Sequence, residues 1–312
     1  MPQPPPQYLL ARRESRRSKR RRRRRIEAAF SLLLVLTAAG VVAVLQLRGA
    51  RAIAHRRVAL VERPRVRPRP PARGPAVITP AIAARISRLA GYGLPVYCGG
   101  PHGNAVALTF DDGPGPYTYL ALRKLSRAHE HATFFVVGRS IDHYPRWLPR
   151  ELKVAAIGDH TYTHPYLPAL SKAEITGQIE RTAERIVEDS GQTALLFRPP
   201  YGGRNAVVDA AAKRLGMLEI LWSVDSRDSL GANWAAIIAN VEAGLHPGAI
   251  ILMHENRGQT IRALTTILPY MHAHHVRSVS IPELLASDPP TLAQLRAGGR
   301  GCGTGRVGLT GS

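Results

Sequence analysis

Two adjacent carboxylates end an apolar run in the segment VALTFDDGP, residues 106–114. Asp111 and Asp112 repel each other at this spacing, and burying either one without a partner would cost several kcal/mol. The sequence therefore predicts a compensating cation beside the pair. Gly113 and Pro114 follow directly and are typical of a sharp turn, which would let both carboxylates face one site.

A second group of candidate ligands lies in the segment HTYTH, which begins at His160 and ends at His164. A His-x3-His pair in a tight turn can bind one divalent metal, although two surface histidines give the same pattern. With one of the two aspartates, the pair would form a three-ligand site with room for a water and a substrate oxygen. The other aspartate could then act as a general base. This donor set suits Zn²⁺, with Co²⁺, Ni²⁺ or Mn²⁺ as substitutes.

Three further segments carry polar residues that fit a hydrolytic reaction. Arg198 in RPPYGG could hold the base aspartate or form a structural salt bridge, and the N–H of Tyr201 could bind an oxyanion. His254 in ILMHE could protonate a leaving amine or be a core histidine. Asp228 could orient that histidine, with Asp225 as the alternative partner.

Strand-like and helix-like segments alternate from residue 105 onward, in about seven units. This alternation indicates an α/β fold with a parallel sheet, and the number of units favours a (β/α) barrel. The candidate site residues follow apolar strands, and in a barrel those strand ends share one face. The clearest helix spans 171–191, with a capping box from Ser171 to Glu174 and an end at Gly191. Another helix is expected over 141–154, and one long strand over 218–228.

The net charge of +21 is unevenly distributed along the 312 residues. Residues 1–73 hold 20 Lys/Arg and three Asp/Glu, whereas residues 74–312 are nearly balanced, with 23 and 19. Eleven Lys/Arg between 12 and 25 precede 18 uncharged residues, 28–45, a length that approaches a bilayer core. The positive-inside rule then places the N-terminus in the cytoplasm and the rest outside the cell membrane. The expected parts are a basic tail (1–26), a transmembrane signal-anchor (27–47), a Pro/Arg-rich linker (48–96), a folded domain (97–302) and a tail (303–312).

Two other interpretations of the N-terminal segment compete with the anchor. A cleaved signal peptide would release a secreted protein, although its apolar core is usually shorter. An Arg-rich arm that binds nucleic acid is disfavoured by the adjacent apolar segment. The chain has two cysteines, Cys98 and Cys302, near the ends of the folded part. In an exported domain they are expected to form one disulfide, the alternative being two free thiols.

Five motifs occur in the order TFDDGP, HTYTHP, RPPYG, WSVDSRD and LMH. In these motifs residues 100–285 resemble the polysaccharide deacetylases, the NodB-homology carbohydrate esterases. The resemblance implies a distorted (β/α) barrel with fewer than eight units and a metal-dependent N-deacetylase. It implies these roles: Asp111 as base; Asp112, His160 and His164 as metal ligands; Arg198 as support of the base; Tyr201 as oxyanion donor; Leu252 in the acetyl pocket; His254 as acid.

One departure from the family pattern concerns the wall of the substrate groove. Family members often carry a tryptophan directly after the fourth-motif aspartate, whereas Ser229 follows Asp228 in this chain. Trp222 and Trp234 are close in sequence, and Trp222 is a candidate substrate contact.

The expected activity is removal of acetyl groups from N-acetylglucosamine in a cell-wall polymer, with peptidoglycan as the expected polymer. Chitin-oligomer deacetylation and acetylxylan esterase activity are alternatives within the same class. An inactive carbohydrate-binding wall protein is an alternative of another class, and a non-haem iron oxygenase is a third, because two histidines and a carboxylate also serve that chemistry.

Overall fold

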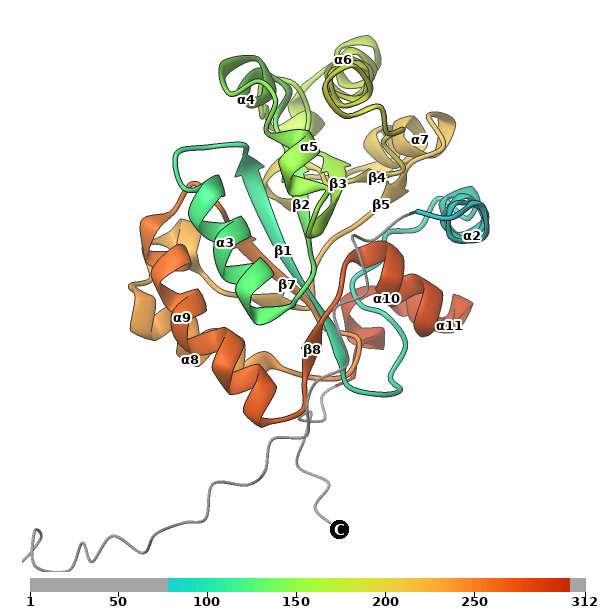
Figure 1. Cartoon of the computed structure of the whole chain (residues 1–312). Helices are drawn as coiled ribbons and strands as arrows, with labels where there is room; N and C mark the ends of the chain where they lie inside the picture. Colours follow the sequence, from blue (N-terminus) through green and yellow to red (C-terminus); the bar gives the residue numbers. More distant parts are fainter. Residues whose placement is uncertain (1–77, 304–312) are drawn as a thin grey trace, which may run out of the picture. The chain divides into compact units, whose positions relative to one another are not determined.

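A computed structural model describes residues 78–303 of the chain (Figure 1). The predicted basic tail, the signal-anchor, the linker up to residue 77 and residues 304–312 lie outside this range. Among the residues it describes, no helix is both long and apolar enough to cross a bilayer.

The centre of the fold is a parallel sheet in the order β5-β4-β3-β2-β1-β7-β6, with β8 paired to β1. Short apolar segments form its strands because both faces are covered, by helices on one side and by the opposite strands on the other. The strands are β1 Ala105–Gly113, β2 Ala132–Val136, β3 Ala155–Asp159, β4 Leu196–Phe197, β5 Leu218–Glu219, β6 Val224–Asp225, β7 Ile250–His254 and β8 Arg277–Ser278.

The two ends of this strand order belong to one chain segment. β5 pairs with β4, whereas β6, which follows after residues 220–223, pairs with β7. The segment therefore closes the sheet into a distorted barrel, as the sequence predicted. The prediction of one long strand over 218–228 is wrong, because this segment forms two short strands, β5 and β6, and residues 220–223 between them belong to neither. We call residues 220–223 the seam of the barrel.

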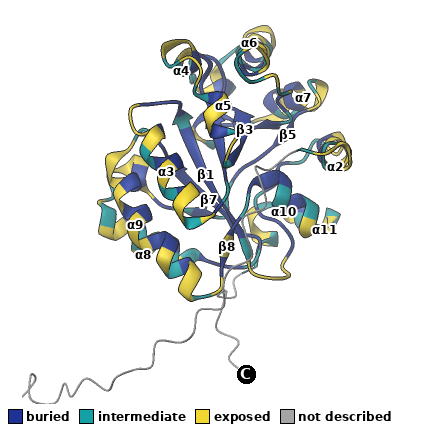
Figure 2. Cartoon of the chain, viewed as in Figure 1, coloured by how far each residue is buried: buried dark blue, intermediate teal, exposed yellow. Residues whose placement is uncertain are grey.

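Helices surround the strands and turn their apolar faces inward, so that their outer faces are exposed (Figure 2). The predicted capping box of α6 is confirmed: the Ser171 side chain accepts the N–H of Glu174, and Gly191 ends the helix in a left-handed conformation. The helices are α2 Pro80–Gly91, α3 Thr118–Ala128, α4 Gly138–His143, α5 Leu148–Glu151, α6 Lys172–Ser190, α7 Ala206–Arg214, α8 Trp234–Gly244, α9 Gly258–Ala273, α10 Ile281–Ser287 and α11 Leu292–Ala297.

The single helix expected over 141–154 is instead divided into α4 and α5. Arg146 lies between them with a φ of 69°, a left-handed conformation that a continuous helix cannot contain. Pro145 directly before it and Pro149 after it also disfavour an uninterrupted helix.

Helix α2 falls within residues 48–96, which the sequence assigned to the linker. Ile86 is fully buried and Leu89 is 7% exposed, and both pack in a cluster with Leu218 and Ile250. The folded part therefore begins before the expected boundary at residue 97. At its other end the predicted disulfide is present, and it joins Cys98 to Cys302 across 204 residues.

Candidate active site

The two adjacent aspartates leave the end of β1 in different directions. Asp111 continues the ladder, opposite His254 of β7 and Phe135 of β2. The register then shifts between Asp111 and Gly113, and Asp112 has a φ of 73°. The bulge at Asp112 itself, just before the expected turn at Gly113-Pro114, therefore lets both carboxylates face the strand ends.

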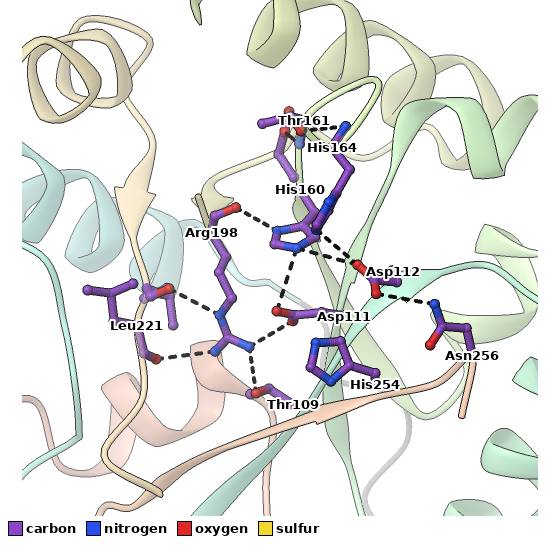
Figure 3. A network of polar contacts seen from close by, with 12 residues as sticks. Thr109, Asp111, Asp112, His160, Thr161, His164, Arg198, Leu221, His254 and Asn256 are labelled. Carbon is purple, nitrogen blue, oxygen red and sulfur yellow. Dashed lines mark hydrogen bonds and ion pairs between the residues drawn. The ribbon is translucent and has the colours of Figure 1, made fainter. Parts of the chain in front are cut away.

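Asp112 forms a candidate metal site with the two histidines (Figure 3). Its Oδ1 lies 3.2 Å from Nε2 of His164 and 3.7 Å from Nε2 of His160. Oδ1 of Asp112 is buried, and within the described part of the chain it has no hydrogen-bond partner. On the other side of the His160 ring, Nδ1 lies 2.7 Å from the Arg198 carbonyl. Because a carbonyl only accepts, Nδ1 carries the proton and Nε2 presents a lone pair.

Lone pairs of a carboxylate and an imidazole therefore meet at the centre of this site, and a divalent cation fits there. Burial lowers the pKa of His160, opposed by Asp111 and Asp112, which favours the neutral form that binds metals. Burial alone would raise the pKa of Asp112. Contact with His164, and the positive charges that His160 and His254 carry when they are protonated, nevertheless hold the pKa of Asp112 well below its usual range.

The loop that carries the histidines is a tight turn, one of the geometries in which a His-x3-His pair can bind one metal. Thr161 and His164 both have positive φ, and the N–H of His164 donates to Oγ1 of Thr161 at 3.2 Å. Gln178 of α6 fixes the loop from outside, because its Oε1 accepts the N–H groups of Tyr162 and Thr163 at 3.1 and 2.9 Å.

Arg198 is the charge partner of Asp111. The guanidinium is fully buried, and its Nη1 donates to Oδ1 of Asp111 and to Oγ1 of Thr109, both at 2.8 Å. Nε donates to the Ile220 carbonyl at 3.1 Å, and Nη2 to that of Leu221 at 3.2 Å. Burial lowers the pKa of Arg198 and Asp111 opposes this, so that a charged guanidinium faces the carboxylate.

The structure decides between the two possible partners of His254. Nδ1 of His254 lies 2.7 Å from Oδ1 of Asp228, whereas Asp225 accepts the N–H of Arg227. Oδ2 of Asp228 also accepts from the Thr260 hydroxyl at 2.5 Å. Burial lowers the pKa of His254, but the Asp228 contact and the charge of Asp111 outweigh it and raise that pKa above its ordinary value.

The three predicted substrate contacts lie around these groups. Leu252 is two residues before His254 on β7, so the two side chains share one face of the sheet. Tyr201 has a φ of 60° in the turn Pro200–Gly202, named η2, and its ring is edge-on to His164 with centroids 4.7 Å apart. The Arg198 guanidinium lies over the ring of Trp222, with Cζ of Arg198 5.7 Å from the centroid of that ring. Ser229, which follows Asp228, is exposed.

Backbone strain is concentrated at this face of the barrel. Eight non-glycine residues in the described range have positive φ, and five of them belong to the site segments: Asp112, Thr161, His164, Tyr201 and Arg227. Such conformations are costly and persist where the surroundings impose them, which is common at functional sites.

Sequence reasoning missed three residues that contact the site. Thr109 binds Arg198, and Nδ2 of Asn256 donates to Oδ2 of Asp112 at 3.2 Å (Figure 3). Glu255 is fully buried and hydrogen-bonded to Thr118, and burial raises the pKa of Glu255 well above its usual range. A β-carbon on Gly113 would collide with the Glu255 carboxyl, at 1.4 Å. Thr109 and Asn256 each lie two residues from a predicted site residue, and this spacing is the only feature of the sequence that could have pointed to them.

The polysaccharide deacetylase family model matches residues 99–220. A chitooligosaccharide deacetylase of Rhizobium leguminosarum bv. trifolii is 34% identical over 197 residues, covering 57% of this chain and 90% of that protein. The chain therefore belongs to the polysaccharide deacetylase family.

A peptidoglycan-N-acetylglucosamine deacetylase of Listeria monocytogenes is 37% identical over 181 residues, 57% of this chain. The match covers only 38% of that relative, so the chain spans less than half of its length.

Two solved structures show the same fold. The peptidoglycan deacetylase PdaC from Bacillus subtilis is 34% identical with a TM-score of 0.57, over 60% of this chain and 92% of that one. A CE4 family pseudoenzyme from Bacillus anthracis is 32% identical with a TM-score of 0.58, over 61% and 68%. Because the fold is similar to both, the fold alone does not establish catalysis.

Proposed function

We propose that this chain is a metal-dependent N-deacetylase that removes acetyl groups from N-acetylglucosamine units of a cell-wall polymer, with peptidoglycan as the substrate. One observation carries the proposal: the adjacent aspartates serve two separate centres. Asp112 faces two imidazole nitrogens, while Asp111 is held by Arg198 in the ladder beside His254. A ligand set, a base and an acid therefore share one face of the barrel, as amide hydrolysis requires.

A divalent metal, when bound, would polarise the acetyl carbonyl and lower the pKa of a water. Asp112, His160 and His164 would hold it. Asp111 takes a proton from the attacking water, and Arg198 keeps that carboxylate oriented and ionised. The N–H of Tyr201 would donate to the oxyanion that develops on the acetyl oxygen. His254 donates its Nε2 proton to the leaving nitrogen as the C–N bond breaks, while Asp228 holds the proton on Nδ1. The products are acetate and a free amine.

We propose zinc as the native metal because a His2Asp donor set suits it. Co²⁺, Ni²⁺ or Mn²⁺ could bind the same ligands. Metal analysis of the chain as isolated, followed by reloading of chelator-treated protein with each ion, would identify it. A preparation that regains no acetate release with Zn²⁺ would refute this assignment.

We also propose that residues 27–47 anchor the chain in the cell membrane with the catalytic domain outside, next to its substrate. The run without charge and the basic block before it support this topology. Finding the mature N-terminus after residue 47 in a secreted form would favour signal cleavage instead.

The decisive experiment measures acetate release by the full chain from peptidoglycan, chitin oligomers and acetylxylan, with and without oxygen. Asp111→Asn should abolish turnover and retain metal, whereas His160→Ala should lose both. Preference for chitin oligomers or acetylxylan would redirect the substrate assignment. No acetate from any polymer, with metal bound, would favour an inactive carbohydrate-binding protein, and a strict oxygen requirement would favour an oxygenase.

A further inference from the structure

Two exposed tyrosines extend away from the metal site in a row of aromatic rings. The ring of Tyr201 is edge-on to His164, and the ring of Tyr166 is tilted against Tyr201 with centroids 6.5 Å apart. Tyr201 is 70% exposed and Tyr166 is 55% exposed, although large aromatic side chains usually bury most of their surface. Nothing in the hydrolytic reaction explains the exposure of Tyr166.

The backbone holds Tyr166 in place. Pro165 and Pro168 restrict the chain on both sides, Leu167 between them is fully buried, and the Tyr166 carbonyl accepts the N–H of Ala169. The Cδ2–Cε2 edge of the ring lies against Gly203, where a β-carbon would be 2.6 Å from Cε2 of Tyr166. The rest of the ring supplies the exposed surface that is available to a ligand.

A rigid, exposed aromatic face is suited to a saccharide unit. The flat faces of a β-linked glucosamine ring carry C–H groups and its edges carry hydroxyls, so the sugar can stack while its polar edges stay in water. A ring that is already held in place loses little conformational entropy on binding. Tyr201 has ring contacts with both Tyr166 and His164, so a sugar on Tyr166 would lie one aromatic ring farther from the ligand His164 than a sugar on Tyr201 and would not be the one whose acetyl group reacts.

We propose that Tyr166 forms a binding subsite for a neighbouring sugar unit of the polymer, with Tyr201 beside it. The proposal rests on the proposed deacetylase function, since it names the part of the substrate that the same site recognises. It gives the site an aromatic contact on the Tyr166 side, whereas the residue that follows Asp228 is the small, exposed Ser229.

The test compares Tyr166→Ala with Tyr92→Ala in the full chain. Tyr92 is a matched control because it is 46% exposed but lies at the end of α2. With an N-acetylglucosamine pentamer, Tyr166→Ala should raise KM roughly tenfold, as expected for the loss of one aromatic contact, with little change in kcat. Hydrolysis of 4-nitrophenyl acetate, which is too small to reach Tyr166, should be unchanged, and Tyr166→Trp should restore KM.

A second measurement does not depend on turnover. Calorimetric titration of metal-free protein with a glucosamine pentamer should show roughly tenfold weaker binding for Tyr166→Ala than for wild type or Tyr92→Ala. Equal affinities, or no binding by wild type, would overturn the subsite. If wild type releases no acetate but Tyr166→Ala still weakens binding, the proposed activity fails and the subsite stands.

Discussion

Both oxygens of the Asp228 carboxylate bind His254: Oδ1 lies 2.7 Å from Nδ1 of the ring, and Oδ2 accepts the backbone N–H at 2.7 Å. The short turn Asp228–Leu230 presents the carboxylate to β7, and Thr260 of α9 supports it from behind. The ring of His254 is therefore fixed in one orientation and one tautomer.

Replacing Asp228 should change the pH dependence of the reaction. His254, the proposed general acid, must be protonated to act. Because its pKa is raised, His254 keeps that proton to higher pH than an ordinary histidine. Asp228→Asn removes the main cause of that increase, so the alkaline limb of kcat/KM should move to lower pH, and kcat should fall by at least about tenfold. A pH profile of acetate release measures both effects. Asp225→Asn is the matched control, and a shift in that variant would argue against the specific pair.

Asn256 should influence metal affinity although it is no ligand. Its Nδ2 holds Oδ2 of Asp112 and leaves Oδ1 toward the histidines. Asn256→Ala should weaken metal binding by about 10–100-fold, the usual effect of removing a hydrogen bond to a ligand. Titration of the metal-free protein with Zn²⁺ in competition with a chelating dye would measure this. Asn104→Ala, at an exposed asparagine, should leave the affinity unchanged; equal losses in both variants would contradict a role for Asn256.

Arg198 should matter for folding as well as turnover. Arg198→Ala would leave Asp111 buried without its charge partner and should lower the free energy of unfolding by about 3–5 kcal/mol. Arg198→Lys keeps the charge but cannot reproduce the planar set of four contacts, so activity should fall while part of the stability returns. Urea unfolding followed by tryptophan fluorescence reports on the folded domain, since all three tryptophans lie within the described residues 78–303. Arg214→Ala, at an exposed arginine, should cost little.

Glu151 should make stability depend on pH. Burial and the charge of Asp189 raise the pKa of Glu151 from 4.5 to about 8. Because ionisation of the buried carboxyl is unfavourable only in the folded state, stability should be lost as pH rises from 4.5 toward 8. Glu151→Gln should therefore gain stability relative to wild type across that range, on the order of 2–4 kcal/mol at pH 8.

The slope with pH is the informative quantity for Glu151, because any packing defect of the amide would be the same at every pH. Urea unfolding at pH 5, 6, 7 and 8 would measure it. Glu184→Gln, on the exposed side of α6, should show no such slope. If the free energies of unfolding of wild type and Glu151→Gln changed in parallel with pH, Glu151 would not be the buried acid that causes the loss of stability.

The barrel and most of the site could be predicted because strand ends in a barrel meet at one face, so residues far apart in sequence become neighbours. The sequence favoured Asp228 but left Asp225 open, since the choice depends on the positive φ of Arg227, which redirects the chain by one short turn. Helix α2 was hidden by the basic composition of the segment before it. Asn256 and Thr109 act through single hydrogen bonds, which leave no pattern in a sequence.

The contacts of Arg198 at the seam link the catalytic site to the stability of the fold. The guanidinium donates to the carbonyls of Ile220 and Leu221, which belong to the seam between β5 and β6. The same guanidinium also binds Asp111. Loss of Arg198 would leave both seam carbonyls and Asp111 without their guanidinium partner, and loss of Asp111 would leave the buried guanidinium unpaired, whereas loss of His254 would break none of these contacts. Selection for folding alone would therefore tend to preserve Arg198 together with Asp111, so retention of this pair marks the architecture, whereas an intact His254 would be the better marker of a working enzyme.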